Sequence, residues 1–248
     1  MKTRFPASAS RLRRVGKLSR WVAGAALAGL LTGCATGPGA NPADPLEPFN
    51  RGVSRFNDTV DDAVLVPVAT AYRQALPSLV RTGVNNFFGN LGEIWNFANS
   101  AAQLKLQHSA ETFMRFNVNT FFGLGGLLDI ATEAGIDRHN EDFGQTLGRW
   151  GVGSGPYLVI PLLGPSSVRD AAAMPVDRVG DPLMYMGDVA ARNSLNVLRL
   201  VDLRSNYLRA GQLLDDAALD KYSFTRDAYL QRRLNDVHDG NLPDGGDE

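Results

Sequence analysis

The sequence predicts a mainly helical protein whose connections are irregular and rich in glycine and proline. Apolar residues recur at helical spacing through most of the chain after residue 45, and glycines and prolines interrupt these stretches. Only Tyr157–Ile160 has the pattern of a short strand or an extended loop. No repeat of fixed period and no second domain boundary is visible, so we expect one helical domain over residues 46–236.

The first 33 residues predict a signal peptide that is removed in the mature protein. Seven basic residues precede residue 21, an apolar run of 11 residues follows at 21–31, and the first acidic residue is Asp44. A run of this length suits a signal peptide and is too short to cross a bilayer. The pair Arg13 and Arg14 leaves twin-arginine export open beside the Sec route.

Cys34 is the predicted site of lipid attachment. The only cysteine of the chain follows Leu31, Thr32 and Gly33, which resembles the lipobox of bacterial lipoproteins, whose cysteine carries acyl chains such as palmitate. The alternative is a buried core thiol, and a lone cysteine excludes an intramolecular disulfide in either case. Each buried methylene contributes about 0.8 kcal/mol to membrane binding, so several acyl chains anchor a protein stably. No cofactor is expected beyond this covalent lipid.

The residues next to Cys34 predict a tether and a destination. Residues 34–45 hold three prolines and two glycines, the composition of a flexible linker between a lipid and a folded body. Position 35 is alanine, whereas in lipoproteins of this type an aspartate there commonly causes retention in the inner membrane. We therefore expect the outer membrane.

The charge of the mature chain disfavours nucleic acid as a partner. All 26 acidic residues but only 18 of the 25 basic residues follow residue 33. A net acidic chain is a poor general binder of phosphate backbones.

After the tether, apolar residues recur at helical spacing in several successive stretches, each of which predicts an amphipathic helix. The first contains Phe49, Val53, Phe56, Val60 and Val64, and Pro67 is expected to end or kink it. A second begins after Pro77, and a break is expected at Gly92. Another begins with Ser109 as the predicted N-cap.

The most apolar segment follows Ser109 and contains Phe113, Phe121, Phe122 and Leu128. Its apolar residues surround the helix axis, which is typical of a helix buried in a protein core or in lipid. Gly123, Gly125 and Gly126 interrupt it, which favours a tight turn. No run of 18 apolar residues follows Cys34, so no conventional transmembrane helix is predicted.

Glycine and proline punctuate residues 143–182, after which the helical pattern returns. One stripe includes Ala190, Val197 and Leu208, and a short helix is expected over residues 225–236. Residues 237–248 are predicted to be an acidic, disordered tail.

Recognised catalytic and nucleotide-binding patterns are absent from the sequence. There is no G-x-x-x-x-G-K-[ST] loop and no G-x-S-x-G nucleophile elbow, and the glycines around Ser154 favour a structural turn. His108, His139 and His238 are far apart in sequence, so no metal site is expected. Adjacent carboxylates such as Asp61 and Asp62 are better explained by solvated faces or helix caps.

Four blocks of residues resemble the MlaA family, also called VacJ lipoproteins. They are Asp44-Pro45-Leu46-Glu47-x-Phe49-Asn50-Arg51, Arg81-x-Gly83-Val84-x-Asn86-Phe87-x-x-Asn90-Leu91, Arg115-Phe116-x-x-Asn119-Thr120-x-x-Gly123-x-Gly125-Gly126-x-x-Asp129, and Asp142-Phe143-Gly144-Gln145-Thr146-Leu147-Gly148 running on to Gly155-Pro156-Tyr157. The resemblance covers residues 44–170 and fades after about residue 190.

The resemblance implies a lipid transporter that is not an enzyme. Family members are rings of amphipathic helices that lie in the inner leaflet of the outer membrane around a central amphipathic channel. They remove mislocalised glycerophospholipids from the outer leaflet and thereby maintain lipid asymmetry. They associate with trimeric porins and pass the lipid to a soluble periplasmic carrier protein.

Six residues are candidates for the channel or its turn. We expect Gly123, Gly125 and Gly126 to turn the chain tightly near the channel, and Asn85, Asn119 and Arg149 to face the lipid head group. Close helix packing is the alternative for the glycines, and an ordinary surface charge is the alternative for Arg149.

Other functions remain open at this stage. From periodicity alone, a compact core of helices packed on one another is favoured over a body lying partly in the bilayer. The rival function is a structural envelope lipoprotein that scaffolds partners without moving lipid. An acyl-transferring or phospholipid-degrading enzyme would need a nucleophile and a base, and the sequence offers no pattern for either.

Overall fold

The computed structural model describes residues 44–241. The chain divides into two compact units, Met1–Pro48 and Phe49–Glu248, and the fold described below is that of the second. The predicted signal peptide, Cys34 and the tether up to residue 43 lie outside the described residues.

The described chain is mainly helical, which confirms the predicted fold class. The α-helices are α2 (Glu47–Val60), α3 (Val66–Ala75), α4 (Ser78–Ala102), α5 (Leu106–Phe121), α6 (Ile130–Glu133), α7 (Phe143–Arg149), α8 (Val168–Gly180), α9 (Val189–Ala217) and α10 (Lys221–His238). A π-helical turn, η1 (Asp61–Leu65), precedes α3, and a 3₁₀ turn, η2 (Pro182–Tyr185), precedes α9. Among the described helices, none combines the length and the apolar character that a membrane span requires.

One hairpin accompanies the helices. The predicted extended segment forms strand β1 (Tyr157–Ile160), which pairs antiparallel with β2 (Gly164–Ser167). The pairing of β2 was not apparent from its sequence, Gly-Pro-Ser-Ser, which has no apolar alternation.

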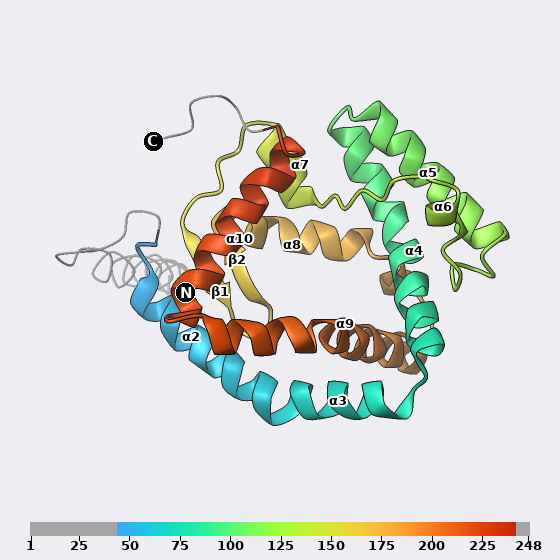
Figure 1. Cartoon of the computed structure of the whole chain (residues 1–248). Coiled ribbons are helices and arrows are strands. Elements are labelled where there is room, and N and C mark those ends of the chain that lie inside the picture. Colours follow the sequence, from blue (N-terminus) through green and yellow to red (C-terminus); the bar gives the residue numbers. More distant parts are fainter. Residues whose placement is uncertain (1–43, 242–248) are drawn as a thin grey trace, which may run out of the picture. The chain divides into compact units, whose positions relative to one another are not determined.

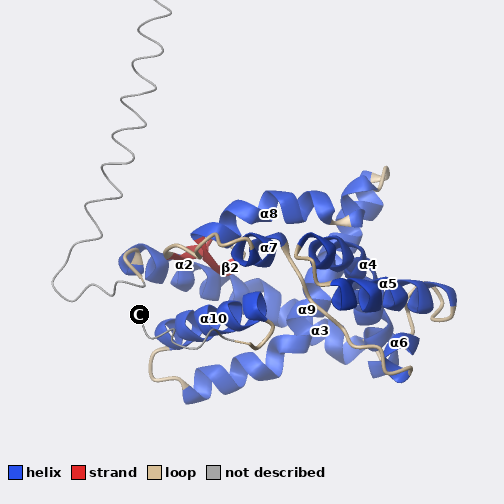
Figure 2. Ribbon diagram, turned by 90° about the horizontal axis from the view of Figure 1, so that it is seen from above, coloured by secondary structure: helices blue, strands red, loops and turns tan. Residues whose placement is uncertain are grey.

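The ribbons of the second unit follow a ring-like course (Figure 1). In Figure 1, α3 and α9 lie along its lower side, α4 along its right, α10 along its left, and α8 above. Helix α5 packs along the outer side of α4, and α7 packs on α8 (Figure 2). This arrangement is consistent with the expected ring of helices.

Pro67 does not end the first helical stretch, but the stretch changes direction between α2 and α3, beside this proline, as the predicted kink requires (Figure 1). Proline is the second residue of α3, inside a continuous helical stretch, where it donates no backbone hydrogen bond to the preceding turn. The preceding π-helical turn accommodates the change of register, since the backbone N–H of Val66 donates to the carbonyl of Asp61. The chain therefore stays helical as far as Ala75.

Two other local predictions are wrong: a helix break at Gly92 and a helix start at Ser109. Helix α4 continues through Gly92 because a single glycine lowers helix stability without breaking a well-packed helix. Ser109 is not a cap, since α5 begins at Leu106 and the Ser109 N–H donates to the Lys105 carbonyl within the helix.

Helix α10 is longer than predicted at both ends. The Asp220 carboxylate accepts a hydrogen bond from the Tyr222 N–H and caps the helix four residues earlier than expected. At the other end Val237, placed in the predicted tail, is buried against the fold. The helix ends at His238, its C-cap residue Asp239 has a φ of +51°, and residues 242–248 lie outside the described residues.

A conventional apolar core lies around the hairpin. Tyr157 and Val159 of β1 and Tyr222 of α10 are buried together. Asn50 of α2 fixes β1 against this core, because its amide donates to the Tyr157 carbonyl at 3.0 Å and its side-chain oxygen accepts from the Val159 N–H at 2.9 Å.

The α4–α5 pair has a different burial pattern: most of its buried residues are polar, and many of its large apolar residues are exposed. The buried residues of α5 are Ser109, Thr112, Arg115 and Asn119. Its large apolar side chains are exposed instead: Phe113, Met114 and Phe121, followed by Phe122, Leu124, Leu127 and Leu128 in the turn beyond. Of the two alternatives for this segment, packing in a protein core does not describe these exposed side chains, and contact with lipid stays a prediction.

Candidate functional site

The three predicted glycines lie in a tight turn after α5. Leu124, Gly125 and Gly126 all have positive φ, at +54°, +71° and +94°. A side chain on Gly126 would place its Cβ 2.6 Å from the Cβ of Asn90, and one on Gly123 would collide with the Leu128 carbonyl. Turn geometry and close packing both require glycine here, and a role beside the channel stays a prediction.

A buried network of charges holds this turn against α4. The Arg115 side chain is fully buried, and its guanidinium donates to Glu93 at 3.1 Å and to Asp129 at 2.9 Å. Arg138 reaches the same two carboxylates at 3.3 Å each. Two arginines and two carboxylates therefore neutralise one another inside the helix pair.

Asn119 belongs to this network, so we assign it to the turn and not to a head-group contact. Its amide donates to Asp129 at 3.0 Å, and its side-chain oxygen accepts from the Ala131 N–H at 2.9 Å. Burial acts to raise the pKa of Asp129, but hydrogen bonds from Thr132 and Asn119 outweigh it, and the pKa lies below its usual value. Asp129 is thus held as a carboxylate.

Polar groups line the inner side of α4, where it faces α9. A cavity of about 310 Å³, here called the α4–α9 cavity, is lined by both helices and by the loop that holds Arg138 and Asn140. Arg199 and Asp202 of α9 and the predicted residue Asn85 of α4 also line it. Asn85 thus lines an interior cavity, and its contact with a head group stays a prediction.

A mostly apolar cavity adjoins the first. It has a volume of about 660 Å³, is called here the α8 cavity, and is lined by Leu163, Met174 and Pro175 together with charged residues. Gly92, Asn96 and Arg199 line both cavities, so the two share a wall. Polar and apolar space therefore lie next to each other in the interior.

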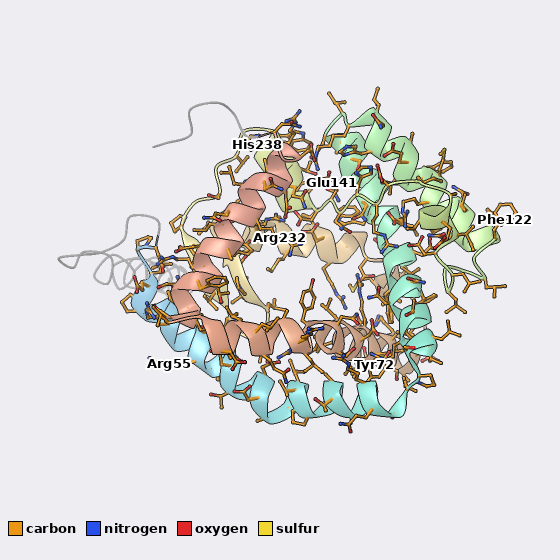
Figure 3. All side chains as sticks on the ribbon, viewed as in Figure 1. Arg55, Tyr72, Phe122, Glu141, Arg232 and His238 are labelled. Atoms are coloured by element: carbon orange, nitrogen blue, oxygen red, sulfur yellow. The ribbon has the colours of Figure 1, made fainter. Side chains whose placement is uncertain are left out.

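Two further cavities are lined in part by residues of α10. One of about 360 Å³ is mostly polar and is lined by Arg138, Glu141 and Arg232 among others; the other, of about 900 Å³ beside β1, is mostly apolar. Arg232 lines both, and Figure 3 shows Arg232 and Glu141 on the inner side of the helices, whereas Phe122 lies at the outer edge. The interior is amphipathic.

Arg149 is not part of these cavities. It is exposed in the last turn of α7 and lines none of the five cavities given by the described residues. The surface-charge alternative describes its position.

Asp202 is the most enclosed charged group of the α4–α9 cavity. Its carboxylate accepts from the Tyr72 hydroxyl at 2.9 Å and from the amides of Asn85 and Asn206 at 3.4 Å each. Burial and the hydrogen bond to Asp202 raise the pKa of Tyr72 to about 12, which keeps this phenol protonated as a donor.

Two of the three histidines, His108 and His139, lie side by side although they are distant in sequence. His108 and His139 stack with ring centroids 3.8 Å apart, and nitrogen or oxygen atoms of His108, Glu141 and Asp239 lie within 4.8 Å of one another. The Lys105 ammonium already contacts both carboxylates, at 2.8 and 2.6 Å. This lysine occupies the place where a cation would bind.

Sequence reasoning missed Arg138, Arg199, Asn96 and Asp202. Each lies on an amphipathic helix or in a loop, where polar residues are expected to face water. The signal that could have found Asp202 is its position on the apolar side of α9, next to Val201 and one turn from Leu198.

The comparisons agree with this architecture. A sequence model of the MlaA lipoprotein family matches residues 42–236. The chain is 35% identical over 209 residues to the intermembrane phospholipid transport system lipoprotein MlaA of Escherichia coli, covering 82% of each chain. It is 34% identical over 225 residues to the protein of that name from Haemophilus influenzae, covering 86% of this chain and 88% of the relative.

Two further matches extend the comparison. An uncharacterised protein of Rickettsia bellii is 33% identical over 191 residues, covering 77% of this chain and 75% of the relative. A solved structure described as the structural basis for maintenance of bacterial outer membrane lipid asymmetry superposes with a TM-score of 0.69 and 34% identity, covering 78% of this chain and 98% of that one. The protein described here belongs to the MlaA lipoprotein family.

Proposed function

We propose that this protein is an outer-membrane lipoprotein that removes mislocalised glycerophospholipids from the outer leaflet and passes them towards a soluble periplasmic carrier. The observation that carries the proposal is the inverted α4–α5 pair, with many apolar side chains outside, beside polar and apolar cavities that share a wall. Its relatives from two bacteria are named as lipoproteins of an intermembrane phospholipid transport system.

The exposed apolar side chains support a body that lies in a membrane leaflet. Phe121, Phe122 and Leu124 are each at least 70% exposed and are adjacent in the chain. Water disfavours such a patch, and acyl chains accept it without any helix spanning the bilayer.

The cavities support passage of an amphipathic molecule. Acyl chains fit the apolar lining of the α8 cavity, while the polar groups of the α4–α9 cavity suit a head group. The sequence has no nucleotide-binding loop, so passage would be passive and the energy would be supplied by a partner.

The remaining parts of the proposal concern anchoring and partners. Acyl chains on Cys34 would hold the protein in the outer membrane, and a trimeric porin would hold it beside the outer leaflet. The role proposed is transport without catalysis, and it requires no cofactor beyond the covalent lipid.

The proposal is tested by measuring glycerophospholipid exposed in the outer leaflet of cells. Cells that lack the protein are expected to expose more, the intact protein to reverse this, and the Cys34→Ala form to fail. An unchanged outer leaflet, with the protein shown to be present in the control cells, would contradict lipid removal and leave a scaffold.

A second variant tests the turn. Gly125→Val puts a β-branched residue at φ +71° and is expected to impair lipid removal while the protein stays anchored. Normal removal by this variant would contradict a role for the turn in transport.

A further inference from the structure

The α4–α9 cavity contains charges of both signs. Arg138, Arg199 and Asp202 line the same space of about 310 Å³, together with the side-chain amides of Asn85 and Asn96. A ligand in this cavity meets two guanidinium groups and one carboxylate.

The guanidinium group of Arg138 is held in place. Its Nε and Nη2 face Glu93 and Asp129 at 3.3 Å each. Gly89 of α4 lies beside it, and a Cβ at that position would be 3.2 Å from Nη1. The glycine thus lets the guanidinium lie close to the helix at the cavity wall.

The guanidinium group of Arg199 has only a shared counter-ion. Its Nη1 lies 3.1 Å from the Asp181 carboxylate, and Nη1 of Arg178 lies 3.2 Å from the same oxygen. One carboxylate therefore serves two arginines, which leaves an excess positive charge beside the cavity. Each guanidinium has five N–H donors, so donors remain for an anion.

Asp202, in contrast, is a negative charge whose hydrogen-bond donors are all neutral. Its three hydrogen-bond donors, Tyr72, Asn85 and Asn206, are all neutral, and the residue is 2% exposed. Among the described residues it forms no ion pair; Arg81, which acts electrostatically on Tyr72, does not pair with it. A buried carboxylate without a counter-ion is unfavourable, and a cation in the cavity would relieve this.

The neighbouring space suits acyl chains. Arg199, Gly92 and Asn96 form the wall shared with the α8 cavity, where Met174, Pro175 and Leu163 provide apolar surface. A phosphodiester at Arg199 would thus lie at the junction of polar and apolar space, as it does in a glycerophospholipid.

Resting on the proposed function, we propose that the α4–α9 cavity is a head-group subsite selective for zwitterionic glycerophospholipids. Arg138 and Arg199 bind the phosphodiester, and the Asp202 carboxylate binds the ammonium group of the head group. Lipids whose head group carries no cation leave Asp202 uncompensated and bind more weakly.

The first test measures selectivity. The purified full chain in detergent is incubated with mixed micelles of equal phosphatidylethanolamine and phosphatidylglycerol, and the retained lipid is quantified by mass spectrometry. We expect about fivefold enrichment of phosphatidylethanolamine, because charge complementarity largely sets specificity. A wild-type ratio of one overturns the proposal without any variant.

Two substitutions of aspartate on α9 separate the role of Asp202 from a general change of charge. Asp202→Asn keeps an acceptor oxygen for Tyr72 and is expected to bring the ratio close to one without lowering the total lipid. Asp216→Asn, an exposed residue of the same helix, is expected to keep the wild-type ratio. An unchanged ratio in Asp202→Asn overturns the assignment of the ammonium site.

Two substitutions of arginine test the phosphodiester site. Arg199→Gln is expected to lower total retained lipid about tenfold, whereas Arg209→Gln, exposed on the same helix, leaves it unchanged. Circular dichroism shows that each variant is folded. Wild-type retention by Arg199→Gln overturns this subsite, whereas a wild-type protein that retains no lipid at all contradicts the proposed function itself.

A soluble competitor distinguishes the source of the phosphodiester. Glycerophosphoethanolamine has the same head group but no acyl chains, so we expect it to compete poorly with the intact lipid. Competition equal to that of the intact lipid would assign the cavity to a soluble phosphodiester and overturn its assignment to a lipid.

Discussion

The hairpin region and the α4–α5 pair place their apolar side chains on opposite sides. Around β1, Tyr157 and Val159 are buried against Tyr222, as in a water-soluble domain. In the α4–α5 pair the buried groups include Arg115 and Glu93, and many large apolar groups, such as Phe113 and Phe121, are exposed. One chain thus combines an apolar core with a polar, charged one.

The difference teaches what each region requires from its surroundings. An apolar core is stabilised by water around it, because burial removes apolar surface from water. A polar interior with apolar side chains outside gains nothing from that effect in water, and its charges must satisfy one another. The environment of the α4–α5 pair can therefore be inferred from its burial pattern.

The largest expected effect comes from breaking the buried charge network. Arg115→Met leaves Glu93 and Asp129 with one arginine fewer, and the uncompensated buried charge should lower the free energy of unfolding by about 3–5 kcal/mol. Thermal unfolding in detergent, followed by circular dichroism, measures it. Arg232→Met, whose side chain is 72% exposed, is the control and should change stability little. Equal losses in both would contradict the importance of the network.

The next effect concerns the glycine turn. Gly126→Ala combines φ +94° with a Cβ 2.6 Å from Asn90, so we expect a loss of about 3 kcal/mol in the free energy of unfolding. Gly125→Ala has a similar φ but nothing within 4 Å, so strain alone should cost about 1 kcal/mol. Chemical denaturation of both variants gives the difference, and equal losses would show that the contact with Asn90 does not matter.

In the hairpin region, Asp170 is expected to make stability depend on pH. Burial acts to raise the pKa of this carboxyl, but hydrogen bonds from Arg233 and Tyr229 outweigh it and lower the pKa to about 2. Since the pKa falls from about 3.9 on folding, the contribution of about 2 kcal/mol is complete above about pH 5 and is lost as the pH falls towards 2.

Denaturation at pH 7 and pH 3 measures this contribution. Asp170→Asn should be destabilised at pH 7 and should lose less stability than the wild type between pH 7 and pH 3. If both proteins lost the same amount, the acid sensitivity would have another source.

The smallest effect on stability is expected at the outer surface of the inverted pair. Phe122 is 74% exposed, so Phe122→Ser should change the free energy of unfolding by less than about 0.5 kcal/mol. In the Cys34→Ala background, which lacks the anchor, the variant should bind phospholipid vesicles about tenfold more weakly. Phe88→Ser, at a buried phenylalanine, should instead lower stability by about 3 kcal/mol. Unchanged vesicle binding by Phe122→Ser would mean that this surface does not face lipid.

Sequence reasoning succeeded where the information is local. The helical stripes, the β1 strand and the glycine turn depend on spacing and on backbone conformation within a few residues. It failed at Gly92 and Ser109, where the packing of the whole helix overrides a local stop or start signal.

The candidate site was largely beyond that reasoning. Asn85 and Asp202 are 117 residues apart, and no local pattern brings them into one cavity. Asn119 was recognised as a functional candidate, but its role in the turn depends on Asp129 and Ala131, which approach only because the glycines reverse the chain.

The sequence by itself determined that the chain is helical, that its helices have two faces, and that its family is that of MlaA lipoproteins. Only the tertiary structure decided which face points inward. Periodicity gives the angle between polar and apolar side chains around a helix axis, but it is the same whether water or lipid surrounds the fold. The burial of Arg115 and the exposure of Phe122 show which face points inward, because each is a property of how helices pack and not of any one helix.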